Sequence, residues 1–177
     1  WTAIRGIGLF QINPENNSFK LYQSEKSNPY SISGNNNDCI AESKTGELWI
    51  YDRYSGINKF IPETEIFYNY ENSPYIKSVL ESLGRVISIE CDKNGYIWFG
   101  ATKSYYVYNP KENRFILTGK TKAESENKPA KDMISNIYED PTGLIWVLYG
   151  DSGLEILDPY QNKFSKWYNT FSIDDDY

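Results

Sequence analysis

The 177-residue sequence contains no histidine, and this absence limits the chemistry that the chain can perform. Serine and cysteine nucleophiles are usually activated by a histidine, and many zinc sites use histidine ligands. Cys39 and Cys91, the two cysteines, do not have the spacing of a metal-binding pair. We expect two free thiols, with a disulfide as the alternative, and we expect neither a metal site nor a cofactor.

Long apolar runs and concentrated positive charge are missing as well. No run of 18 apolar residues occurs, and the first residues lack the basic-then-apolar pattern of a signal peptide. The net charge is −6, so we expect no nucleic-acid partner and no membrane contact by this part of the chain. The four arginines are too dispersed along the sequence to suggest an anion clamp; they are Arg5, Arg53, Arg85 and Arg114.

Aromatic residues, in contrast, are abundant: the chain has 16 Tyr, 8 Phe and 5 Trp. Four tryptophans, Trp1, Trp49, Trp98 and Trp146, are separated by 48, 49 and 48 residues. Other residues keep the same register, namely the prolines at 14, 62, 110 and 159, the phenylalanines at 19, 67, 115 and 164, and the glycines at 46, 95 and 143. A period of this length indicates a repeat architecture.

Each repeat has the pattern of four short strands. An alternating first strand ends in a turn such as "DKNG" or "DPTG", a tryptophan-bearing second strand follows, and two further strands are separated by turn residues. Consecutive antiparallel strands at this period are typical of β-propeller blades. We therefore predict an all-β fold, a fragment of a β-propeller over residues 1–177 with about four four-stranded antiparallel blades. The predicted blades cover residues 1–30, without a first strand, and residues 31–73, 84–120 and 131–170.

The repeated residues have predicted structural roles. We expect Trp49, Trp98 and Trp146 to pack between stacked sheets, where an indole buries a large apolar area. Gly46, Gly95 and Gly143 are expected at the last position of their turns.

Two linkers between the predicted blades differ from each other. Ser73, Pro74 and Gly84 are typical of the start and end of a helix, so we predict one short helix over residues 74–83. Residues 119–132 are charged and nearly free of apolar side chains, which predicts a mobile loop.

The run Gly-Asp-Ser-Gly at residues 150–153 is similar to the surroundings of a serine-protease nucleophile. Ser152, however, holds the same repeat position as Ser55, and the chain offers no histidine base, so we interpret it as a turn residue. The carboxylates Glu42 and Glu139 also recur at one repeat position, which favours an architectural role over catalysis. We therefore predict that this part of the protein is not an enzyme.

The segment "IYEDPTGLIWVLYGDSGLEILDPYQNKFSKW" resembles the two-component-regulator propeller repeat, and the likeness extends over nearly the whole chain in four copies. Ser43, in place of the turn aspartate, and Tyr105, in place of a glycine, depart from the repeat pattern. Kelch repeats have a similar period but need a Gly-Gly pair that is missing here.

The resemblance implies a function that composition does not show. Repeats of this family build the periplasmic half of hybrid two-component sensors, which detect oligosaccharides and control genes for glycan breakdown. It implies that the histidine kinase and the DNA-binding part lie elsewhere in the full-length protein.

Binding is therefore the function class that we favour, with oligosaccharide as the expected ligand. The loops between the second and third strands vary most and carry stacking and hydrogen-bonding side chains; the candidate ligand-binding residues are Arg53, Tyr54, Lys103, Tyr105, Tyr106 and Asp151. The alternatives are a scaffold that binds only protein and a propeller glycoside hydrolase or lyase, which needs two carboxylates across a cleft.

The number of repeats raises the question of how the ring closes, because propellers ordinarily have about four to eight blades. The chain begins at Trp1, inside a repeat, and we expect it to be a piece of a larger propeller, whose remainder is then its partner. Pairing of two copies and a closed ring of four blades are the alternatives.

The terminal "IDDDY" could suggest calcium binding, but adjacent aspartates alternate in direction, so we expect a disordered end.

Overall fold

The computed structural model describes residues 1–69, 71–73, 84–102, 104–112, 114–120, 133–150, 153–158 and 163–168. These residues form strands, turns and irregular segments, and no helix occurs among them. The predicted helix over residues 74–83 and residues 121–132 of the predicted mobile loop lie outside the described residues.

The strands form four antiparallel sheets. The first sheet holds β1 (Thr2–Ile4), β2 (Gly8–Asn13) and β3 (Ser18–Tyr22). The second holds β4 (Asn37–Glu42), β5 (Leu48–Asp52), β6 (Gly56–Ile61) and β7 (Ile66–Tyr68). The third holds β8 (Val86–Cys91), β9 (Ile97–Ala101), β10 (Ser104–Asn109) and β11 (Arg114–Lys120). The fourth holds β12 (Ile134–Glu139), β13 (Ile145–Tyr149), β14 (Gly153–Asp158) and β15 (Lys163–Tyr168).

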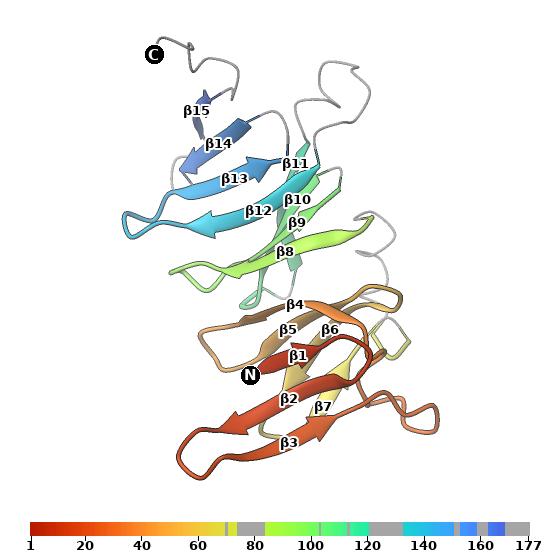
Figure 1. Ribbon diagram of the computed structural model, residues 1–177. Helices are drawn as coiled ribbons and strands as arrows, with labels where there is room; N and C mark the ends of the chain where they lie inside the picture. The colour runs from red at the N-terminus through yellow and green to blue at the C-terminus, as the bar shows by residue number, and fades with distance from the viewer. Residues whose placement is uncertain are drawn as a thin grey trace, which may run out of the picture.

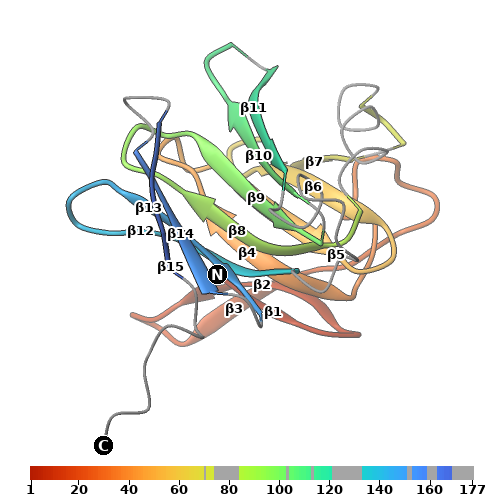
Figure 2. The same ribbon diagram turned by 90° about the horizontal axis from the view of Figure 1, so that it is seen from above.

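Within each sheet, strands that follow one another in sequence are neighbours in space. Figure 1 shows the four sheets stacked in chain order, with the first sheet at one end and the fourth at the other. The first strands β4, β8 and β12 contact one another in turn, and in Figure 2 successive sheets are rotated relative to each other. This arrangement confirms the predicted all-β propeller fragment.

The turns before the tryptophan strands follow the predicted chemistry. In the third sheet the N–H of Gly95 donates to the carbonyl of Asp92 at 2.9 Å, which closes a four-residue turn. Gly95 has φ +84, in the left-handed region that favours glycine. Gly46 and Gly143 repeat both features with φ +82 and +91. A side chain on the first turn residue completes the turn, because Asp92 Oδ1 accepts the N–H groups of Asn94 and Tyr96.

Apolar cores lie between neighbouring sheets. Trp1 packs against Phe60 of the second sheet, Trp49 against Phe99 of the third, and Trp98 belongs to a cluster with Ile137 and Val147 of the fourth. Each indole therefore contacts the sheet that follows its own. Trp49 and Trp98 are both 2% exposed.

Both cysteines are free. The thiol of Cys39 donates to the carbonyl of Ile87 at 2.9 Å and so joins the second sheet to the third. Burial, followed by the charge of Asp38, raises the pKa of Cys39 to about 11. A thiol with this pKa is inert at neutral pH.

Candidate ligand-binding site

The first strand of each four-stranded sheet contains a β-bulge at the same repeat position. The register shifts between Asn37 and Cys39, between Val86 and Ser88, and between Ile134 and Asn136. Bulges re-aim a side chain and are common next to functional sites. In the second sheet the bulged residue is Asp38.

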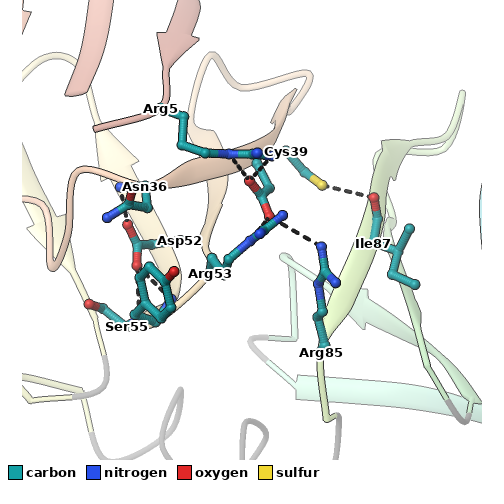
Figure 3. Close-up of polar contacts among 10 residues, drawn as sticks. Arg5, Asn36, Cys39, Asp52, Arg53, Ser55, Arg85 and Ile87 are labelled. Carbon is teal, nitrogen blue, oxygen red and sulfur yellow. Dashed lines mark hydrogen bonds and ion pairs between the residues drawn. The ribbon is translucent and has the colours of Figure 1, made fainter. Parts of the chain in front are cut away.

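Three arginines from three sheets converge on the Asp38 carboxylate (Figure 3). Arg5 follows β1, Arg53 follows β5 and Arg85 precedes β8. The Nε and Nη2 atoms of Arg5 lie 2.9 and 2.7 Å from Oδ1 of Asp38. Nε of Arg53 lies 2.9 Å from Oδ2, and Nη2 of Arg85 lies 3.6 Å from the same oxygen. We call these four residues the arginine cluster.

Asp38 remains ionised within the arginine cluster. Burial alone would raise the pKa of Asp38, but the hydrogen bonds from Arg53 and Arg5 and their positive charges outweigh it and lower the pKa. The side chain of Asp38 is only 9% exposed, whereas those of Arg5, Arg53 and Arg85 are 59%, 32% and 53% exposed. The carboxylate is therefore the buried centre and the guanidinium groups form the surface.

A second buried carboxylate fixes the loop that carries Arg53. Asp52 is 0% exposed, and its Oδ1 accepts the backbone N–H groups of Tyr54 and Ser55 at 2.9 and 2.8 Å. Its Oδ2 accepts the N–H of Asn36 at 2.6 Å. These backbone hydrogen bonds hold the loop between β5 and β6 to the start of β4, so Arg53 and Tyr54 have a defined position.

A cleft of about 450 Å³ lies beside this loop. Its lining residues are Ser33, Tyr51, Arg53, Tyr54, Ser55, Gly56, Glu71 and Gly84. Tyr54 is 79% exposed, so a large part of its ring is available for contact. Aromatic faces combined with a few fixed polar groups are typical of small-molecule sites.

The predicted ligand-binding residues have different positions. Arg53 and Tyr54 both line the cleft. Lys103 and Asp151 lie outside the described residues, as does Ser152. Tyr106 is half-buried and packs against Phe115.

The prediction that Tyr105 faces a ligand is not supported, because Tyr105 is only 2% exposed. The connection between β9 and β10 is short, so Tyr105 already lies within β10 and pairs with Gly100. Its ring lies 5.9 Å from that of Trp98, in the core between the third and fourth sheets.

The expectation that the arginines are dispersed is wrong, since three of the four meet at Asp38. Separation in the sequence is no guide here, because the stacking of sheets brings equivalent loop ends together. One signal was available: Arg5 and Arg53 both lie four residues after a repeat tryptophan. Nothing in the repeat pattern marked Asp38 or Arg85.

Within the described residues no group of three or more acidic, cysteine or histidine side chains could hold a metal ion. The same part of the chain has no helix long and apolar enough to cross a membrane.

The stacked antiparallel sheets, with an indole at each junction, define a β-propeller fragment with a cleft at one loop end. Comparison with known families agrees with this class. Residues 80–103 match the family model of the two-component regulator propeller, which confirms the resemblance noted from the repeat. No curated protein matches the chain significantly.

Solved structures share the fold. The extracellular domain of a protein described as the hybrid two component system BT4673 from B. thetaiotaomicron has a TM-score of 0.65 at 17% identity, over 94% of this chain and 21% of that one. The corresponding domain of BT3049 from the same organism has a TM-score of 0.51 at 23% identity, over 92% and 26%. The WD40 repeats of RRP9 give 0.55 at 11% identity, over 75% and 38%. The chain thus spans about a fifth to a quarter of the two extracellular domains.

Proposed function

We propose that this chain is part of an extracytoplasmic, periplasmic sensor propeller of a hybrid two-component receptor, and that it binds an oligosaccharide that controls glycan-utilisation genes. The family match at residues 80–103 and the fold shared with extracellular domains of such systems support the receptor role. The kinase activity belongs to other parts of the full-length protein.

The cleft beside Arg53 and Tyr54 is the observation that carries the proposal. A sugar ring presents an apolar face, which an aromatic ring can cover, and hydroxyl groups, which need donors and acceptors. Tyr54 supplies the exposed ring, Arg53 supplies donors, and Glu71 supplies acceptors, all within one cleft of about 450 Å³.

The geometry of the cleft supports glycoside hydrolysis less well than it supports saccharide binding. Glycoside hydrolysis uses two carboxylates on opposite sides of the scissile bond. Among the described residues that line the cleft, only Glu71 has a carboxylate. Asp52 is buried below the loop and its oxygens accept backbone N–H groups. We therefore propose binding without turnover.

A protein-contact role is supported by the outer face of the first sheet. Phe19 is 66% exposed and Ile12 is 50% exposed, and both lie on strands of the sheet at the end of the stack. We propose that the remaining propeller of the receptor covers this face, with a second copy of the chain as the alternative. Light scattering after size-exclusion chromatography decides between them, because pairing predicts a dimer at micromolar concentration.

The experiment for saccharide binding is a calorimetric screen of oligosaccharides against the 177-residue chain, followed by the Tyr54→Ala variant. Loss of one aromatic contact, worth about 0.5–1.5 kcal/mol, should weaken binding about two- to tenfold. Tyr138→Ala is the matched control, because Tyr138 is also an exposed tyrosine but lies on β12. Equal loss in both variants, or no binding in the screen, would overturn the proposal.

A further inference from the structure

The arginine cluster is not electrically balanced. Three guanidinium groups meet one Asp38 carboxylate, which leaves a local excess of two positive charges on a chain whose net charge is −6. The nearby Asp52 carboxylate reduces this excess, but among the described residues it makes no ion pair with the three arginines, since its oxygens accept backbone N–H groups. Glu71, on the lining of the cleft, offsets one of the two charges at most.

The arginines also have N–H donors that bind no acceptor among the described residues. Arg53 bonds to Asp38 through Nε, and among the described residues no acceptor is bound by its two terminal nitrogens. Among the described residues Arg85 makes one ion pair, with Asp38 at 3.6 Å. Arg53 lines the cleft, and so does Gly84, the residue directly before Arg85 in the sequence. Guanidinium groups with free planar donors are well suited to carboxylate and sulfate oxygens.

Orphaned polar atoms at the same end of the second sheet are an independent observation. Ser33 Oγ belongs to a residue that lines the cleft, and it is buried without a hydrogen-bond partner among the described residues. Both polar atoms of the Asn37 side chain, next to Asp38, are buried and unpaired in the same way. Buried polar atoms without partners are costly, and a bound polar ligand is one way to satisfy them.

We propose that the cleft binds a saccharide that carries an acidic group, either a carboxylate or a sulfate ester. The acidic group lies against Arg53 and Arg85, and a neighbouring hydroxyl bonds to Ser33 Oγ. Asp38 is a positioning residue: it holds the three arginines together and its single charge leaves them able to attract an anion. This inference deepens the proposed function and rests on it.

The test compares acidic saccharides with neutral forms of the same shape. Trigalacturonate and its methyl ester form the carboxylate pair, and a 6-sulfated disaccharide and its unsulfated form are the sulfate pair. Calorimetry with the 177-residue chain should show at least tenfold tighter binding for the acidic member of one pair. The pair that responds identifies the acidic group, and added salt should weaken this binding.

Arginine variants locate the site. Arg53→Gln and Arg85→Gln should each weaken binding of the acidic saccharide about tenfold and leave the neutral form within twofold. Arg114→Gln is the matched control, because Arg114 is 63% exposed and pairs with Glu112 outside the arginine cluster, so it should bind like the wild type. Circular dichroism establishes that each variant is folded.

The outcomes separate the inference from the proposed function. The chain could bind the acidic and the neutral saccharide of each pair with equal affinity, and Tyr54→Ala could weaken both. This result would overturn the proposal of an acidic ligand and leave the proposal of saccharide sensing intact. The inference would also be overturned if Arg114→Gln weakened binding of the acidic saccharide as much as Arg53→Gln does. Binding of none of the four saccharides would count against both.

Discussion

At the scale of single residues, the indole N–H groups show how one substitution in a repeat leaves a polar atom unpaired. Trp98 Nε1 donates to Asp92 Oδ2 at 2.8 Å, and Trp146 Nε1 donates to Asp140 Oδ2 at 2.9 Å. The equivalent turn residue before Trp49 is Ser43. Its shorter side chain accepts the N–H of Glu47 instead, and Trp49 Nε1 is buried without a partner in the described structure.

Replacing this serine should therefore stabilise the fold. Ser43→Asp supplies the missing acceptor for Trp49, and a hydrogen bond to a charged group contributes about 1.5–3 kcal/mol when its geometry is good. We expect a gain of about 1 kcal/mol in the free energy of unfolding, measured with urea. The converse change, Asp92→Ser, should cost a similar amount. A variant Ser43→Asp no more stable than the wild type would show that the Trp49 N–H is satisfied in another way.

A second residue-scale prediction concerns Gly34, which lies against the carboxylate of Asp52. A Cβ atom at Gly34 would lie 2.5 Å from Asp52 Oδ2, and Asp52 cannot move without losing its backbone hydrogen bonds. We expect Gly34→Ala to destabilise the chain by about 1–3 kcal/mol through overpacking. Gly150→Ala is the control, since its nearest neighbour would lie at 3.8 Å. Equal thermal midpoints for the two variants would contradict the prediction.

At the scale of elements, the turn between β12 and β13 depends on an ionised aspartate. Hydrogen bonds from Thr142 and Trp146, which outweigh desolvation, lower the pKa of Asp140 to about 2. Because the folded pKa lies below the ordinary value of about 4, the stabilisation is complete above that value and is lost as the pH falls towards 2. Asp38 has a lowered pKa as well and contributes in the same direction.

Asp140→Asn should remove part of this acid sensitivity. We expect the thermal midpoint of the wild type to fall between about pH 5 and pH 2, and to fall less steeply in the variant, since its side chain does not titrate. Thermal unfolding followed by tryptophan fluorescence at several pH values measures both slopes. Glu15→Gln, an exposed control, should retain the slope of the wild type. Identical slopes in wild type and Asp140→Asn would contradict the assignment.

Strands and turns were predictable from sequence because local rules determine them. The alternation around Trp98 indicates a strand, and the glycine at 95 is required by a left-handed turn position, whatever the tertiary context. The arginine cluster was not predictable, because it depends on a bulge at Asp38 and on how three sheets stack. The sequence places Tyr105 in a ligand-facing loop, whereas the structure places it in a core strand, because a one-residue difference in connection length decides between the two positions.

At the scale of the whole molecule, the sheets are joined by polar contacts as well as by apolar packing. Cys39 bonds to Ile87 of the third sheet, and Ser88 Oγ donates to Asn136 Oδ1 of the fourth at 2.8 Å. Cys39 and Ser88 hold the same repeat position, directly after the bulge. The repeat therefore encodes the contact between sheets along with the sheet itself.

Equivalent tryptophans should nevertheless contribute unequally to stability, because their burial depends on the following sheet. Trp98 is enclosed by the fourth sheet and is 2% exposed. On β13, Ile145 and Val147 face the core shared with the third sheet, so by alternation Trp146 faces away from it, and it is only half-buried.

Truncating the two tryptophans tests this difference in the 177-residue chain. Trp98→Ala should cost about 3–5 kcal/mol, because it leaves a cavity between two sheets. Trp146→Ala should cost about 1–3 kcal/mol, since less apolar area is lost from burial. Urea unfolding at one protein concentration measures both. Equal losses of stability would mean that the outer face of the fourth sheet is covered in solution. Unfolding at a lower protein concentration would then show whether a second copy covers this face, because a dimer loses that stability as the concentration falls.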